Sequence, residues 1–222
     1  GEDSAMYIAS VLGRFPDNLD DAIVPRARLV DAVDRELEPV GPAILACDVA
    51  RFGADRTVVY RRQGPVCRLV WRTQGRDTQE VAGRLKIMAE DDPEVDTIIV
   101  DDTGLGGGVT DRLNEEQPRN GEVRIVAFNG GEKATRSDRY VNRMAEAWME
   151  LGEAFREGNI DIDDNPSVIS QLSSRRFTIQ GDRRIKLESK EEYKKRSTGG
   201  SPDDADALAM CYGWQGPGLG VW

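Results

Sequence analysis

Histidine is absent from this chain of 222 residues. Ser-His-Asp and Cys-His nucleophile systems need an imidazole, and so do the His-metal nuclease motifs and most catalytic zinc sites. The sequence therefore excludes these mechanisms. Any catalysis must rely on carboxylates, hydroxyls, amines or a bound hard cation.

Cysteines and long apolar runs are also scarce. Cys47, Cys67 and Cys211 are odd in number, widely spaced and form no CxxC pair. This usage favours buried thiols in a reducing intracellular compartment. No apolar run approaches the ~20 residues that cross a bilayer. The first residues resemble no signal peptide and Gly1 stands where an initiator methionine would, so we expect a piece of a longer chain.

Charge is unevenly distributed. The chain carries 40 acidic and 30 basic side chains, for a net charge of -10. This balance argues against a stand-alone, high-affinity nucleic-acid binder. Residues 172–200 are the exception, because nine basic and four acidic residues give them +5 and leave the remainder at -15.

Hydrophobic patterning predicts an α/β fold with a mixed central sheet, helices on both faces and a small β-hairpin near the C-terminus. Residues 1–40 are expected to be a partly helical lead-in, and residues 41–222 one domain. Strands are predicted at residues 43–50, 57–62, 66–73, 97–100, 123–128 and 160–162, with the second and third joined as a hairpin and a smaller hairpin at 176–187. Helices are predicted at residues 77–89, 109–117, 136–157, 165–174 and 201–212.

Two acids stand where acids are costly. Asp48 interrupts an apolar strand and Asp101 follows another, so each needs a partner. Parallel neighbours lie about 4.8 Å apart, which would let the two side chains face each other. The last predicted helix adds Asp203 and Asp206, which are three residues apart and share a helix face.

Convergent carboxylates without a nearby histidine are typical of a hard-cation site. Mg2+ and Mn2+ prefer oxygen ligands, and two such ions can hydrolyse a phosphodiester. Each acid also has a plainer interpretation, as the partner of a core arginine or as a helix cap. The coincidence of all three positions favours the metal site.

Three segments resemble successive motifs of the nuclease domain of the large terminase subunit of tailed phages. They are LACDVARFGADRTVVYRRQG (45–64), IIVDDTGLGGGVTDRL (98–113) and RSTGGSPDDADALAM (196–210). GEDSAMYIASVLGRFPD resembles the family's link to a packaging ATPase, and RYVNRMAEAWMELGEAFREGNIDI its long central helix. The resemblance implies a fold similar to ribonuclease H and retroviral integrases, over nearly the whole chain.

The resemblance also implies site residues. Asp48 is similar to the metal ligand of the first strand, and Asp101 to the acid that opens an Asp-x-x-Gly turn. Asp206 matches the third acid best, with Asp203 as the second choice. Two ions, Mg2+ or Mn2+, are expected. Asp102 and Asp204 are expected to be solvated or one contact removed from the ions. Asp55, in the turn after the first strand, is expected either to approach the second ion or to serve only the hairpin turn.

Two other features have open interpretations. The glycine-rich turn with Gly104 and Gly106 fits neither a Walker loop nor GxGxxG, and is expected to be a tight strand-to-helix turn rather than a nucleotide site. The basic stretch is either a solvated face or a DNA contact. Its candidates for DNA contact are Lys190, where the family also has a lysine, Arg183, Arg184, Lys194 and Lys195. Trp148 is expected to be a core residue.

The resemblance implies an endonuclease that cuts concatemeric double-stranded DNA with little sequence preference during genome packaging. Its partners would be DNA, an N-terminal ATPase domain, the small terminase subunit and the portal, in the host cytoplasm and without a membrane. A junction-selective nuclease similar to Holliday-junction resolvases, and a docking domain without catalysis whose acids form ion pairs, are alternatives. Preferential cutting of four-way junctions would favour the first, and absence of Mn2+ binding the second.

Overall fold

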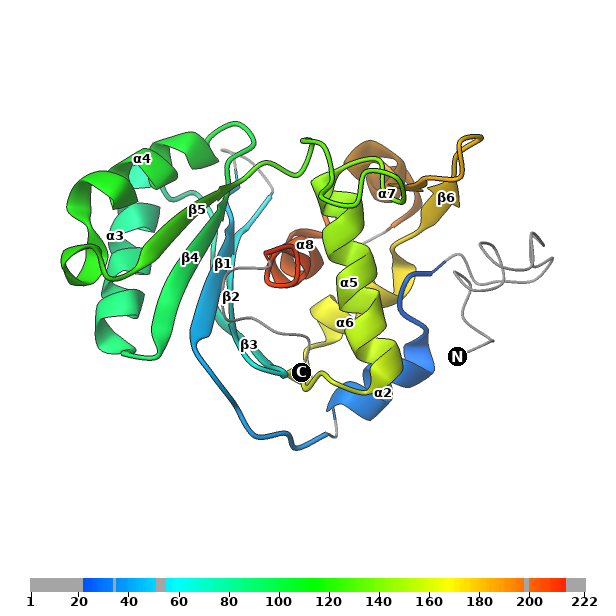
Figure 1. Ribbon diagram of the computed structural model, residues 1–222, viewed down its shortest axis with the longest axis horizontal. Helices are drawn as coiled ribbons and strands as arrows, with labels where there is room; N and C mark the ends of the chain where they lie inside the picture. The colour runs from blue at the N-terminus through cyan, green and yellow to red at the C-terminus, as the bar shows by residue number, and fades with distance from the viewer. Residues whose placement is uncertain (1–21, 34, 51–54, 198–199, 215–222) are drawn as a thin grey trace.

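The computed structural model describes residues 22–33, 35–50, 55–197 and 200–214 (Figure 1). Its central sheet has five strands in the spatial order β3-β2-β1-β4-β5. The strands are β1 (Ala43–Asp48), β2 (Thr57–Gln63), β3 (Val66–Thr73), β4 (Val95–Asp101) and β5 (Arg124–Phe128). A separate hairpin consists of β6 (Phe177–Ile179) and β7 (Ile185–Leu187).

The sheet is mixed, as the sequence predicts. Strand β2 pairs antiparallel with both β1 and β3, whereas β4 pairs parallel with β1 and with β5. All six residues of β1 are buried, because this strand lies in the centre of the sheet with helices over both faces. The carboxyl ends of β1 and β4 consequently emerge side by side at one edge of the sheet.

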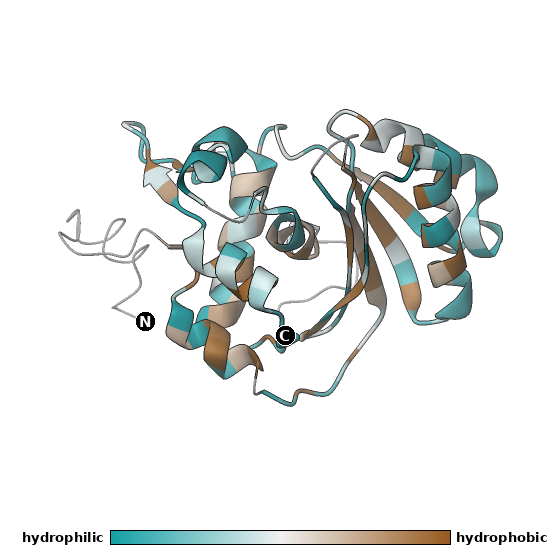
Figure 2. Cartoon of the chain, turned by 180° about the vertical axis from the view of Figure 1, so that it is seen from behind, coloured by the Kyte–Doolittle hydropathy of each residue, from teal (hydrophilic) through white to brown (hydrophobic). Residues whose placement is uncertain are grey.

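Helices cover both faces of the sheet (Figure 1). On one face lie α3 (Thr78–Asp91) and α4 (Gly106–Glu116), followed by the short 3-10 helix η1 (Pro118–Gly121). On the other face lie α2 (Arg26–Val33), α5 (Arg143–Glu157), α6 (Pro166–Ser174), α7 (Lys190–Arg196) and α8 (Asp203–Met210). Each face has its own cluster of buried apolar side chains, and Figure 2 shows the hydrophobic residues concentrated on the strands. Within the described residues no helix is long and apolar enough to span a membrane.

Helix α8 lies in the interior, between the sheet and α5. Its alanines, at positions 205, 207 and 209, let it pack closely against β1, β2 and α5. Every residue of α8 is buried. Any acid on this helix therefore needs a partner within the protein, because water does not reach it.

Several predicted boundaries differ from the structure. Helix α5 begins at Arg143 rather than 136, because Asn142 caps it and the Val141 N–H donates to the Ile185 carbonyl of β7 instead. The strand predicted at residues 160–162 is reduced to a single bridge from Asp161 to Val66. Helix α7 was not predicted, and its start is fixed by a capping box between Ser189 and Glu192.

The described part of the predicted lead-in packs on the core of the domain. Leu29 of α2 is fully buried in the larger apolar cluster, and the Ile23 N–H donates to the Arg175 carbonyl at 3.1 Å. Residues 1–21, which carry the helical spacing of the lead-in and the resemblance to an ATPase link, lie outside the described residues. The domain boundary at residue 41 stays a prediction.

Candidate active site

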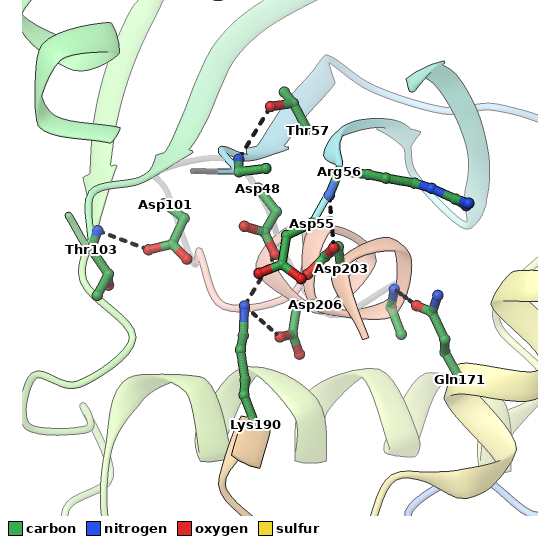
Figure 3. A network of polar contacts seen from close by, with 12 residues as sticks. Asp48, Asp55, Arg56, Thr57, Asp101, Thr103, Gln171, Lys190, Asp203 and Asp206 are labelled. Carbon is green, nitrogen blue, oxygen red and sulfur yellow. Dashed lines mark hydrogen bonds and ion pairs between the residues drawn. The ribbon is translucent and has the colours of Figure 1, made fainter. Parts of the chain in front are cut away.

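Four carboxylates converge where β1, β4 and α8 meet (Figure 3). Asp48 and Asp101 are the last residues of β1 and β4, and the parallel register places Cys47 opposite Val100 immediately before them. Asp203 and Asp206 occupy the first turn of α8. The four residues are 4%, 9%, 7% and 0% exposed, so their charges must be balanced within the site.

Three of these carboxylates each accept a hydrogen bond at one oxygen from an N–H group of the protein. The pairs are Thr103 N–H to Asp101 Oδ1 at 2.9 Å, Arg56 N–H to Asp203 Oδ2 at 3.0 Å, and Trp148 Nε1–H to Asp206 Oδ1 at 2.9 Å. These bonds orient the carboxylates, and they leave the second oxygen of each acid for another partner.

The side chain of Lys190 enters the cluster from the first residue of α7 (Figure 3). Its ammonium lies 3.1 Å from Asp206 Oδ2 and 3.4 Å from Asp48 Oδ2. Burial opposes its charge, but Asp48, Asp206 and Asp203 outweigh that effect and raise the pKa of Lys190. The lysine is therefore a cation at every physiological pH.

One ammonium does not balance four acids. Burial raises the pKa of Asp48 to about 8, with the charges of Asp203, Asp206 and Asp101 adding to the effect and that of Lys190 opposing it. Burial also raises the pKa of Asp203. Burial opposes the ionisation of Asp206 too, but Lys190, Arg175 and the Trp148 hydrogen bond together lower its pKa. The site thus has a surplus of negative charge that a cation would stabilise.

The residues fit a hard divalent cation chemically. All candidate ligands are carboxylate oxygens, and Asp206 Oδ2 is buried and meets Lys190 without hydrogen-bond geometry. In the part of the chain that the structure describes, no three Cys, Asp or Glu side chains are already arranged as a metal-ligating group. Lys190 contacts two of the acids instead, so an ion binding there must displace its ammonium.

The other predicted site residues surround this cluster without joining it. Asp55 forms an ion pair with Lys194 at 3.0 Å, and Asp102 accepts a hydrogen bond from the Thr110 hydroxyl. Lys195 of α7 is exposed. Arg183 and Arg184 lie at the turn of the β6–β7 hairpin, where Arg184 pairs with Asp182. None of these positions tests the predicted DNA contacts.

Asp204 is not solvated, so that alternative was wrong, and its place one contact removed from an ion stays a prediction. It is 1% exposed, and one oxygen pairs with Arg72 of β3 at 2.5 Å. Its other oxygen accepts hydrogen bonds from Ser167 and Gln171 of α6, both at 2.8 Å. Gln171 also accepts the Ala205 N–H at 3.0 Å. Asp204 thereby fixes the first turn of α8, which carries Asp203 and Asp206, to the sheet and to α6.

Replacing Asp204 by alanine should destabilise the chain by about 3 kcal/mol, because buried Gln171 and half-buried Arg72 would both lose Asp204 as their acceptor. Urea denaturation followed by circular dichroism measures this change. Asp111→Ala, at an exposed acid of α4, is the matched control and should change stability by less than about 0.5 kcal/mol. Equal stability of the two variants would contradict the assignment.

The glycine-rich turn brings the start of α4 against the end of β4. A Cβ atom at Gly106 would lie 1.6 Å from the Asp101 carbonyl oxygen, whereas one at Gly107 would lie 3.6 Å from its nearest neighbour, Asp102 Oδ1. Gly104 adopts a φ of +89°, in the region that favours glycine. The turn is thus the tight strand-to-helix connection that the sequence predicts, and it holds the backbone of Asp101 in place.

Gly106→Ala should therefore lower stability by about 3 kcal/mol and move Asp101, because either the helix or the strand must shift. Gly107→Ala is the control, since it sits within α4 with room for a methyl group and should be neutral or slightly stabilising. Thermal unfolding of both variants decides the matter. A stable Gly106→Ala chain would mean that the turn does not constrain β4.

Sequence reasoning missed the residues that hold the acids. Trp148 was expected to be only a core residue, and Arg175, Gln171 and Arg72 were not considered. Trp148, Gln171 and Arg72 each lie far along the chain from the acid that they contact, and Arg175 acts on Asp206 only through its charge, so no local spacing signals these pairings. The one available signal was the alanine-rich character of α8, since acids on a buried helix need partners.

The sheet order and the placement of the helices identify the fold. A mixed sheet in the order β3-β2-β1-β4-β5, with helices on both faces and a small C-terminal hairpin, is the ribonuclease H-like fold of phage terminase nucleases. The structure is similar to the nuclease domain of the large terminase subunit gp2 of bacterial virus Sf6, with a TM-score of 0.76 and 20% identity over 88% of this chain and 100% of that one. A mutant of that Sf6 domain has been solved with manganese. At this identity the likeness establishes the fold.

Two further comparisons agree. The large terminase nuclease from thermophilic phage G20c with bound magnesium has a TM-score of 0.61 and 12% identity, over 88% of this chain and 98% of that one. A probable terminase large subunit of Enterobacteria phage P7 is 30% identical over 228 aligned positions, which cover 95% of this chain and 45% of the relative. No protein-family model matches. The resemblance to the nuclease domain of large terminase subunits is thereby confirmed, and this chain spans under half the length of its curated relative.

Proposed function

We propose that this chain is a metal-dependent endonuclease that cuts concatemeric double-stranded DNA during viral genome packaging. The observation that carries the proposal is the buried cluster of Asp48, Asp101 and Asp206, with Asp203 beside it, at the carboxyl ends of two parallel strands. The terminase-like fold supports the same activity. A structural ion-pair network alone would not leave the carboxylates in excess over the cations.

Asp48, Asp101 and Asp206 would hold two Mg2+ or Mn2+ ions, with Asp203 as the second choice for the third ligand. Bound ions would supply Lewis acidity toward the phosphodiester and lower the pKa of water. The protein keeps the ligand oxygens oriented through the N–H donors of Thr103, Arg56 and Trp148. With no histidine in the chain, no imidazole competes for the role of base.

Lys190 has two parts in this proposal. Without metal its ammonium balances Asp48 and Asp206. Its side chain is 38% exposed, so it can turn outward when an ion binds and approach a DNA phosphate. The basic residues of α7 and of the β6–β7 hairpin would track the DNA backbone without reading bases.

Removing two exposed basic side chains, with Arg183→Ala and Lys195→Ala in one variant, should weaken DNA binding equally for unrelated sequences. The slope of log affinity against log salt should become shallower by about 2, because each cation neutralises about one phosphate. Fluorescence anisotropy with two duplexes of different sequence measures both quantities. Arg112→Ala, on α4, is the control and should leave the slope unchanged.

We also propose that this chain is part of a longer packaging protein. The P7 relative is more than twice as long as the matched region, which supports an ATPase domain in the same polypeptide as this one. The small terminase subunit and the portal would then bring DNA to a domain whose net charge is -10 and which need not bind DNA tightly alone.

The test is incubation of supercoiled plasmid with Mn2+, with Mg2+ and with EDTA. We expect nicking and linearisation at many positions with either ion and none with EDTA. Cleavage undiminished by EDTA would overturn the proposal. Four-way junctions cut much faster than linear duplex would favour the resolvase-like alternative, and absence of Mn2+ binding by calorimetry would favour a docking domain.

A further inference from the structure

Trp148 is a fully buried residue of α5 whose indole N–H is bonded to an acid of the candidate active site. A buried indole needs one hydrogen-bond acceptor, and a backbone carbonyl would satisfy it. Here the acceptor is Asp206 Oδ1 at 2.9 Å, on α8, 58 positions along the chain. The contact therefore links the long helix behind the site to one predicted metal ligand.

The bond divides the two oxygens of Asp206 between two tasks. Oδ1 is held by the indole, and Oδ2 points to the ammonium of Lys190, 3.1 Å away. A carboxylate pinned at one oxygen cannot rotate freely about its terminal bond, so Oδ2 keeps a fixed direction. The donor is neutral, unlike Lys190, so it can remain bonded to the carboxylate after a cation has taken the other oxygen.

Asp101 and Asp203 are arranged in the same way, each with one oxygen on a backbone N–H. Those two donors belong to the main chain, so only a proline, which also restricts the backbone, would remove them. Trp148 is the side-chain donor of the set, which makes the arrangement testable at Asp206.

The indole also has a cationic neighbour. The guanidinium of Arg175 lies 5.6 Å from the Trp148 ring centre and 5.5 Å from that of Tyr193 in α7. Arg175 is 3% exposed, and among the described residues its Nε and Nη1 atoms have no hydrogen-bond partner. Arg175 thus makes cation–π contacts with both rings, and these contacts link α5 to the helix that carries Lys190.

We propose that Trp148 is a positioning residue of the metal site, which orients Asp206 so that Oδ2 is presented to a divalent cation. This inference rests on the proposed function, since it assigns to Asp206 a metal-ligand role. The competing explanation is that the indole and the carboxylate merely satisfy each other in the core. The two explanations differ in whether the bond affects ion binding.

The experiment measures Mn2+ affinity by calorimetry in the DNA-free chain, for the wild type, Trp148→Phe and Trp71→Phe. Phenylalanine keeps an aromatic ring at position 148 and removes the N–H donor. We expect a dissociation constant about 10-fold higher for Trp148→Phe, the lower end of the effect of losing a ligand's supporting hydrogen bond. Trp71, half-buried on β3, is the matched control, and its variant should stay within about twofold of the wild type.

A second measurement uses only the wild-type chain, so it does not depend on the folding of a variant. In the wild-type chain titrated with Mg2+, the indole N–H resonance of Trp148 should shift as the ion binds, while that of Trp71 should not. Equal Mn2+ affinity of the two tryptophan variants, or a Trp148 resonance that ignores bound Mg2+, would overturn the inference and leave the proposed function intact. Failure of the wild-type chain to bind either ion would overturn both.

Discussion

Asp48→Asn is expected to abolish DNA cleavage and, at the same time, to make the metal-free chain harder to unfold. Cleavage should fall by on the order of 10³-fold, because a missing ligand removes several kcal/mol of Lewis-acid stabilisation at the reacting phosphate. The free energy of unfolding should rise by about 1–2 kcal/mol, because the substitution removes one of four crowded carboxylates. Plasmid cleavage with Mn2+ and urea denaturation without metal measure the two effects.

The gain in stability should depend on pH. The pKa of Asp48 is about 8 in the folded chain and ordinarily 3.8, so between these values the folded state binds more protons than the unfolded state. Stability of the wild type contributed by this group therefore falls as pH rises from about 4 to about 8. The difference between Asp48→Asn and the wild type should grow over the same range.

Asp111→Asn, on the exposed face of α4, is the control for both measurements and should change neither. If Asp48→Asn is less stable than the wild type at pH 8, the claim that the metal-free site carries excess negative charge is contradicted. If Asp48→Asn retains a tenth of the cleavage activity, Asp48 is not a metal ligand.

Lys190→Met is expected to lower the stability of the metal-free chain and to raise its affinity for divalent ions. Methionine keeps most of the aliphatic stem but leaves Asp48 and Asp206 without their cation. Loss of stability should be about 1–2 kcal/mol, less than for a fully buried pair because the lysine side chain is 38% exposed. Affinity for Mn2+ should rise on the order of 10-fold, since no ammonium has to be displaced.

Thermal unfolding with and without Mn2+ tests both halves, because an ion that binds only the folded state raises the melting temperature according to its affinity. The increase caused by Mn2+ should be larger in Lys190→Met than in the wild type. Lys194→Met, which loses only an exposed pair with Asp55, should behave like the wild type. Weaker Mn2+ binding by the position 190 variant would mean that the ammonium and the ion do not compete.

The paired strand ends could be predicted from the sequence because their signals are local. Strand β1 is an apolar run that stops at an acid, and β4 repeats that pattern. A buried parallel pair places both acids at the same edge, whatever the rest of the chain does. The hairpin of β2 and β3 was equally local, with Gly64 at its turn.

The remainder of the site depends on tertiary contacts that no local pattern encodes. The charges of α7 gave no clear apolar face, so neither the helix nor the entry of Lys190 into the acidic cluster was predicted. Asp204 was set apart from Asp203 and Asp206 by its place in the motif, but its burial and its pairing with Arg72 and Gln171 depend on the packing of α8 against α6 and β3. Trp148 had the spacing of a core residue, which it is, and its N–H direction is set by the distance between α5 and α8.

The acidic cluster lowers the stability of the metal-free chain, and the proposed function requires that cluster. Four buried carboxylates on one edge of the sheet are costly for folding without metal, and Lys190 offsets only part of that cost. Asp204 with Arg72 and the Gly106 contact compensate by fixing α8 and β4 independently of the ion. Rigid support around a crowded acidic centre is the arrangement expected for the cation site that we propose.

The most direct measurement is an anomalous difference map from crystals of the chain soaked in Mn2+. We expect density within about 2.1 Å of oxygens of Asp48, Asp101 and Asp206, with the Lys190 ammonium moved out of contact with them. A ligand oxygen from Asp203 instead of Asp206 would correct the choice between those two residues. No anomalous density in the cluster, with Lys190 still paired to Asp48 and Asp206, would contradict the metal site.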